Sequence, residues 1–164
     1  MTELLHNSFI REINFEKILP LWKLLWPNTN NILQISSMKY LGGYDISIYN
    51  KYYPTFFGLY INQKLIGCIS GHKSCHEYYR IRGIYILPEY RNNGYSKFLF
   101  KAIIDQAKKE NSTFIWSFPK KKSIKSYISV GFQQTSKFIT TNTSQNCFVI
   151  QNSYVPKSSS EGTR

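Results

Sequence analysis

The stretch YILPEYRNNGYSKFLFKAI, residues 85–103, decides the fold because the hydrophobic pattern changes its period within it. An apolar run stops at Pro88, the polar loop 91–94 follows, and a helical apolar periodicity begins at Phe98. We therefore expect a strand followed by a helix, with Gly94 at the junction. The first amide groups of such a helix have no carbonyl partners, and the helix dipole adds partial positive charge there.

The loop before this helix has the chemistry of an anion-binding site. Gly94 would let a phosphate approach the backbone, and Arg91 would add a full positive charge. Neither the G-x-x-x-x-G-K-[ST] nor the G-x-G-x-x-G spacing of common nucleotide loops is present. Taken alone, the loop therefore favours a simpler interpretation, a turn with Asn92 left-handed and Asn93 or a neighbour capping the helix.

Outward from this stretch, the chain alternates between strand and helix patterns. Before it we expect a strand over 8–13, a helix over 14–26 that Asn14 caps and Pro20 bends or splits, a second helix over 31–41, and an antiparallel meander of strands over 55–62, 64–73 and 77–88. After it we expect a helix over 95–109, a strand over 113–119, a short helix over 121–130, and two last strands over 132–139 and 146–152.

This order predicts an α+β fold with a mixed, mostly antiparallel twisted sheet of about six to seven strands and flanking helices. Its one parallel crossover joins the fourth and fifth strands, and we expect the sheet to splay there and leave room for a ligand. The length of 164 residues fits a single domain over 1–155, with a flexible tail over 156–164.

Composition restricts the partners and the compartment. The 21 Lys and Arg residues against 9 Asp and Glu residues give a net charge of +12, which favours anionic partners or is simply solvating surface charge. No apolar stretch is long enough to span a bilayer, and the start of the chain lacks the layout of a secretory signal. Three cysteines without framework spacing fit reduced thiols, so we expect a cytoplasmic protein without a membrane partner.

Two segments resemble the GNAT N-acetyltransferase superfamily. Residues 84–99, IYILPEYRNNGYSKFL, resemble its acetyl-coenzyme A binding segment, V-x-P-x-[YW]-[RQ]-x-x-G-x-[GA]. Residues 123–132, SIKSYISVGF, match its second segment, which ends in Y-x-x-x-G-F. The resemblance implies a GNAT-like fold, acetyl-coenzyme A (acetyl-CoA) as cosubstrate, and transfer of an acetyl group directly to a primary amine.

The resemblance also implies roles for individual residues. Backbone groups of Ile84, Tyr85 and Ile86 would pair with the pantetheine arm, amides of Arg91, Asn92, Asn93, Gly94, Tyr95 and Ser96 would hold the diphosphate, Ser123 would lie near the thiol end, and Tyr127 would be the general acid. A buried core aromatic is the alternative for Tyr127. The chain departs from the family pattern at Asn92, Ser96 and Lys120, and has Arg82 and Gly83 where relatives often carry an acid.

An alkylamine is protonated at pH 7 and must lose a proton before it attacks, so a base is needed. Glu77, acting through water, is our candidate, with His72, His76 and Asp45 as other groups near the expected cleft. Alternatively, an acceptor already neutral at pH 7 needs positioning alone. His72, Cys75 and His76 lack a fourth ligand, so we expect no metal site.

The acceptor is left open by the sequence. Arg80 and Arg82, with Lys120, Lys121, Lys122 and Lys125, could receive an anionic acceptor, including nucleic acid or aminoacyl-tRNA. A binding module that kept the fold but lost catalysis is a further alternative. We expect a monomer or a homodimer.

Overall fold

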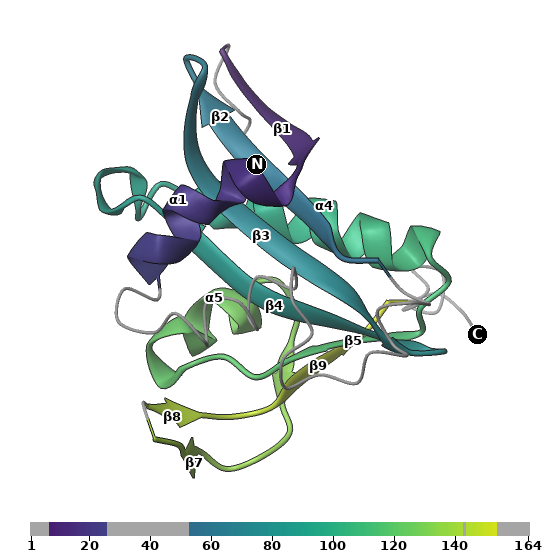
Figure 1. Ribbon diagram of the computed structural model, residues 1–164. Coiled ribbons are helices and arrows are strands. Elements are labelled where there is room, and N and C mark those ends of the chain that lie inside the picture. The colour runs from purple at the N-terminus through teal and green to yellow at the C-terminus, as the bar shows by residue number, and fades with distance from the viewer. Residues whose placement is uncertain (1–6, 26–52, 143, 154–164) are drawn as a thin grey trace, which may run out of the picture.

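A computed structural model describes residues 7–25, 53–142 and 144–153 of the chain (Figure 1). Its elements are β1 (Ser8–Ile13), α1 (Phe15–Leu25), β2 (Thr55–Ile61), β3 (Lys64–Cys75), β4 (Tyr78–Ile86), the 3-10 turn η1 (Pro88–Tyr90), α4 (Tyr95–Lys109), β5 (Phe114–Ser117), the 3-10 turn η2 (Lys121–Ser123), α5 (Ile124–Ser129), β6 (Gln133–Gln134), β7 (Ile139–Thr140), β8 (Gln145–Asn146) and β9 (Val149–Asn152). The helix expected over 31–41 and the tail over 156–164 lie outside the described residues.

The main sheet has seven strands in the order β1-β2-β3-β4-β5-β9-β6, and β7 and β8 form a separate two-stranded ribbon. Every pair in the main sheet is antiparallel except β4 and β5. The predicted α+β fold with a mixed, mostly antiparallel sheet is confirmed. None of the helices in the described part of the chain is long and apolar enough to cross a membrane.

The sheet opens between β4 and β5, as the sequence predicted. These strands pair at only three positions, the last of which joins Arg80 to Trp116. On its other side β4 pairs with β3 as far as Ile86, with a register shift that leaves Arg82 as an extra residue opposite Ser70 and Gly71. A bulge of this kind bends a strand and re-aims its side chains, so β4 turns away from β5 beyond this point.

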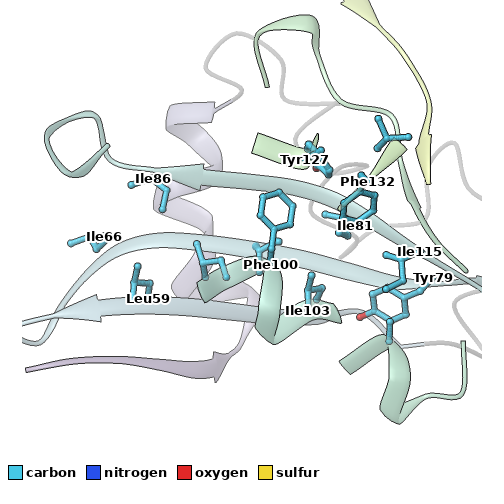
Figure 2. Close-up of a cluster of buried hydrophobic side chains, with 14 of the residues drawn as sticks. Leu59, Ile66, Tyr79, Ile81, Ile86, Phe100, Ile103, Ile115, Tyr127 and Phe132 are labelled. Carbon is cyan, nitrogen blue, oxygen red and sulfur yellow. The ribbon is translucent and has the colours of Figure 1, made fainter. Parts of the chain in front are cut away.

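The helices α1 and α4 cover opposite faces of the sheet (Figure 1). On one face α4 buries a stripe of Leu99, Phe100, Ile103 and Ala107 against strand residues such as Ile66 and Ile81 (Figure 2). On the other face α1 buries Ile18, Leu21 and Trp22 against Phe56 and Cys68. The two clusters hold β3 and β4 between them, so the end of β4 has a fixed position.

The start of α1 confirms one local prediction and corrects another. The Asn14 side chain accepts a hydrogen bond of 3.0 Å from the Lys17 backbone N–H, as a capping residue does. Pro20 lies inside a continuous helix, so of its two predicted effects the split is wrong and the bend stays a prediction. Burial of the apolar face of α1, which includes Trp22, offsets the backbone hydrogen bond that proline cannot make.

The strands expected at the C-terminal end are shorter than predicted. The expected strand over 132–139 is wrong as one element, because only Gln133–Gln134 pair with β9 and Ile139–Thr140 pair with β8. The expected strand over 146–152 is likewise divided between β8 and β9. Hydrogen bonds from Thr135 to Phe148 and from Phe148 to Ser136 hold the chain where the two pairings separate.

Replacing Ile103, which is fully buried, with alanine should lower the free energy of unfolding by about 2–5 kcal/mol, because it leaves a cavity under β3 and β4. Urea unfolding followed by circular dichroism measures this loss. The matched control is Ile128→Ala, at a side chain that is 45% exposed, which should cost about 0.5 kcal/mol or less. Equal losses for the two variants would contradict the described core.

Candidate active site

A cleft of about 430 Å³ lies where β4 separates from β5, next to the start of α4. It is lined by Leu25, Ile84, Tyr85, Ile86, Tyr90, Arg91, Asn92, Gly94, Tyr95, Ser96, Lys122, Ser123 and Ser126. Every cofactor-binding residue expected from the sequence is among them except Asn93. The two motif segments, separated by more than twenty residues, therefore meet at one place.

Asn93 supports the loop rather than the cleft. Its side-chain amide donates to the backbone oxygens of Tyr90 and Arg91 at 3.2 and 3.1 Å. The N-cap of α4 is Gly94, where no side chain caps the helix. The first amides of α4 are therefore left without a capping side chain at the edge of the cleft, which is the arrangement that binds anions.

The loop backbone has the left-handed turns that its residue types allow. Asn92 has φ of 64° and Gly94 has φ of 78°, so the expectation of a left-handed Asn92 is confirmed. A Cβ atom added at Gly94 would meet no other atom within 4 Å. Backbone conformation, not crowding, therefore requires glycine here, and the space in front of its backbone is open.

Arg91 fixes a positive charge beside this loop. Its Nε donates to the backbone oxygen of Ile86 at 2.7 Å, and its guanidinium lies 5.1 Å from the centre of the Tyr85 ring. Both contacts join the loop to the end of β4. The charge is therefore held at the cleft, and Lys122, which also lines the cleft, adds a second charge.

Four lining residues were not predicted for this cleft: Leu25, Tyr90, Lys122 and Ser126. Of these, Lys122 was expected to face the acceptor. Ser126 could have been found, because it lies three positions after Ser123 and so on the same side of the α5 turn. Leu25 had no local signal, since it reaches the cleft only through packing of α1 on the sheet.

Tyr127 is a core aromatic whose hydroxyl reaches the point where the sheet opens. Its ring, only 2% exposed, packs edge-on against Phe100 and Phe132 at 4.9 and 5.4 Å between centroids (Figure 2). The Ser117 hydroxyl lies 3.2 Å from the Tyr127 hydroxyl and 2.8 Å from the Ile81 carbonyl oxygen. Because that carbonyl can only accept, Ser117 donates to Ile81 and accepts from Tyr127.

The Tyr127 phenol stays protonated at neutral pH. Burial raises its pKa to about 12, although the charges of Arg80 and Arg82 act in the opposite direction. Tyr127 does not line the cleft itself, whereas Ser123 and Ser126 of the neighbouring segment do.

Glu77, the candidate base, lies away from this cleft. It is exposed on the turn between β3 and β4, where its backbone oxygen accepts from Thr113 and Phe114 at 2.8 and 3.0 Å. Seven residues of strand, or roughly 23 Å, separate it from Ile84. We expected Glu77 near the cleft. The parallel pairing with β5, however, closes the sheet at the end of β4 that follows Glu77, and the cleft lies at the other end. Asp45 lies outside the described residues.

His72 lies on β3 opposite Arg80 and is 3% exposed. Burial first, and then the charge of Arg80, lower its pKa to about 4, although a hydrogen bond of 2.7 Å to the Lys73 oxygen raises it. Among the residues that the structure describes, no group of three His, Cys, Asp or Glu side chains is placed to hold a metal ion. His72 is therefore a neutral, buried imidazole.

A second hollow, of about 710 Å³, lies on the far side of β5 and is lined by residues of α4, β6 and β9 such as Lys108, Gln133 and Gln151. Its lining contains none of the residues that the sequence predicts to be catalytic or cofactor-binding. Although it is larger, its lining includes no residue from the start of α4, so the smaller cleft is the candidate site.

Comparison with known proteins agrees with this geometry. Residues 18–132 match the model of the Acetyltransferase (GNAT) family. The chain belongs to this family. The match spans both walls of the cleft and supports acetyl transfer in general, without identifying an acceptor. No curated protein sequence matches the chain at a significant level.

Several solved structures share the fold at low sequence identity. A GNAT family acetyltransferase from Elizabethkingia anophelis with acetyl-CoA bound has 15% identity and a TM-score of 0.67, covering 90% of this chain and 99% of that one. A GNAT acetyltransferase from Staphylococcus aureus has 18% identity and a TM-score of 0.67, covering 88% and 98%. Ard1 from Thermoplasma volcanium has 16% identity and a TM-score of 0.65, covering 89% and 97%.

The buried His72 should make stability depend on pH. Because its folded pKa of about 4 is below its ordinary value of 6.5, its contribution is present above pH 6.5 and is lost as the pH falls towards 4. The loss is about 3 kcal/mol at most. Unfolding free energies between pH 4 and 7 should show a smaller slope in His72→Gln than in wild type. An unchanged slope in His72→Gln would contradict a buried, neutral His72.

Proposed function

We propose that the protein is an N-acetyltransferase that binds acetyl-CoA in the cleft between β4 and β5 and transfers the acetyl group directly to a primary amine. One observation carries the proposal: the residues of two separated motif segments line a single cleft, at the uncapped start of α4 and beside the opened edge of β4. Family membership supports the same chemistry.

The cleft fits the phosphate end of this cosubstrate. The amides of residues 91–96 would hold the diphosphate, because the helix start lacks a capping side chain and the space in front of Gly94 is open. Arg91 and Lys122 would neutralise its charge. Arg91 is already positioned by its contacts with Ile86 and Tyr85, so little ordering of this side chain is needed when the anion enters.

The edge of β4 fits the pantetheine arm. Beyond Arg80, no strand in the described part of the chain pairs with the β5-facing edge of β4, although β3 still pairs with its other edge. An extended amide-containing arm can therefore add to this edge as a strand would, with hydrogen bonds to backbone groups of Ile84 and Ile86. Ser123 would lie beside its thiol end.

Catalysis would rest on positioning, on backbone amides of β4 that polarise the thioester carbonyl, and on a proton from Tyr127. Acetyl-CoA supplies an acetyl group activated as a thioester. Tyr127 is protonated at pH 7, and its proton would turn from Ser117 towards the departing sulfur. The raised pKa makes the phenol a weak acid, so it would donate to a thiolate and not to a neutral group.

The strands β4 and β5 and the segment after β5 offer no carboxylate to deprotonate an amine. None of the residues from Tyr78 to Ile86 or from Phe114 to Val130 is acidic. This favours an acceptor that is already neutral at pH 7 over a base such as Glu77. The positive charge of the chain keeps nucleic acid or aminoacyl-tRNA as alternative acceptors, and three free thiols fit a reducing, cytoplasmic setting.

Replacing Gly94 with valine should weaken acetyl-CoA binding about tenfold or more, because a branched side chain would block approach to the loop backbone. Isothermal calorimetry measures the affinity. Asn111→Val is the matched control, since Asn111 also has a positive φ, of 61°, but lies at the other end of α4. Equal affinities in the two variants would contradict the diphosphate site, and no saturable binding by wild type would favour a decayed binding module.

Replacing Tyr127 with phenylalanine should lower kcat by about 100-fold while acetyl-CoA affinity changes little, because only the proton donor is removed. The rate is followed by thiol release with a saturating amine acceptor. Tyr60→Phe, on β2 and stacked on Phe9 at 5.1 Å, should keep the wild-type rate. A wild-type rate in Tyr127→Phe would leave Tyr127 as a core aromatic only.

A further inference from the structure

Three aromatic rings form a continuous strip along β5. The Phe148 ring packs against Trp116 at 5.9 Å and against Phe118 at 4.5 Å between centroids. Phe148 is 38% exposed, and the other two rings are half-buried. We call Trp116, Phe118 and Phe148 the aromatic strip.

The aromatic strip lies on the face of the sheet opposite α4. Ile115 and Ser117 point towards α4 and α5, since Ile115 belongs to the core under α4 and Ser117 bonds to the Tyr127 hydroxyl. Successive side chains of a strand point to opposite faces, so Trp116, between them, points the other way. The face under α4 is filled by the core, so the aromatic strip lies on the other face, the one on which α1 packs.

The strip starts at the point where the sheet opens. Trp116 belongs to the last β4–β5 pair, and Phe118 follows just beyond it. Arg80, the β4 partner of Trp116 in that pair, lies with its guanidinium 4.5 Å from the centre of the Trp116 ring. Arg82 lies two positions further along β4, at the bulge where this strand turns away from β5. The Tyr127 hydroxyl, bonded to Ser117, reaches the same opening from the face under α4.

These groups favour a particular acceptor chemistry. Aromatic rings attract a flat ring by stacking, whereas the arginines favour an anion and disfavour an alkylammonium ion. An amine bonded directly to an aromatic ring is neutral at pH 7 and needs no base before it attacks. This agrees with the lack of acidic residues on β4, on β5 and over 118–130.

We propose that the acceptor is an arylamine that bears an anionic group, with its ring on the aromatic strip and its anion facing Arg80 and Arg82. The inference rests on the proposed function. In the reaction the amine nitrogen bonds to the acetyl carbon as the carbon–sulfur bond breaks. The amine proton passes to water, and the coenzyme thiolate receives the Tyr127 proton, which water then restores.

The test compares three amines at equal concentrations with the full-length protein and acetyl-CoA. The probes are 4-aminobenzoate, which is flat and anionic, aniline, which is flat and neutral, and 6-aminohexanoate, which is anionic but aliphatic and protonated. Initial rates come from thiol release, and products are identified by mass. We expect kcat/KM for 4-aminobenzoate to exceed both others by about tenfold or more. Equal or reversed preferences would overturn the inference.

A variant pair tests the aromatic strip itself. Phe148→Leu should raise KM for 4-aminobenzoate by about 2- to 10-fold, because a stacking partner is lost, and should leave KM for 6-aminohexanoate unchanged. Phe114→Leu is the matched control: it also removes a stacked ring, which lies 5.0 Å from Tyr78, but at the closed end of β5. Equal effects of the two substitutions on 4-aminobenzoate would overturn the role of the strip.

Acetyl-CoA affinity separates this inference from the proposed function. Calorimetry on wild type and both variants should give affinities within about twofold of one another, since no strip residue lines the coenzyme cleft. Saturable acetyl-CoA binding without a preference for 4-aminobenzoate would overturn only the acceptor. Absence of acetyl-CoA binding by wild type would overturn the proposed function and the acceptor together.

Discussion

The early end of the pairing between β4 and β5 is the constraint on which the site depends. Three residue pairs join the strands, and then the bulge at Arg82 turns β4 away while β3 continues to hold its other edge. The cleft, the open backbone edge of Ile84–Ile86 and the uncapped start of α4 all follow at that place. The packed cores on both faces keep the opening from closing, because closure would need β4 to shift against buried side chains of α1 and α4.

Sequence reasoning predicted the parts of the site that are encoded locally. The change of hydrophobic period around Gly94 located the strand, the loop and the helix, and the resemblance of two segments brought Ser123 to the same cleft. Predictions from the sequence were wrong where the position of a residue depends on tertiary structure. The sequence does not show which end of β4 pairs with β5. We therefore expected Glu77 near the cleft, although the length of β4 lies between Glu77 and the cleft. The short C-terminal strands failed for a similar reason, since their pairing is decided by neighbours such as β9 and β8.

Tyr127 shows why the simple and the functional interpretations need not exclude each other. Its ring is part of the core with Phe100 and Phe132 (Figure 2). That packing places its hydroxyl 3.2 Å from the Ser117 hydroxyl, beside the opening of the sheet. The same holds for the loop before α4, where the left-handed Asn92 and the side-chain bonds of Asn93 make a turn that exposes the backbone of Gly94. In both places ordinary structural interactions position the groups that the proposed chemistry needs.

The most direct test of this account is a titration of the isotope-labelled protein with coenzyme A, followed by amide resonances in NMR spectra. The account predicts that the amides of Gly94, Tyr95 and Ser96 and those of Ile84–Ile86 shift together and saturate at one concentration. Shifts confined to other regions, such as the hollow beside Gln133 and Gln151, or the absence of saturation, would contradict it.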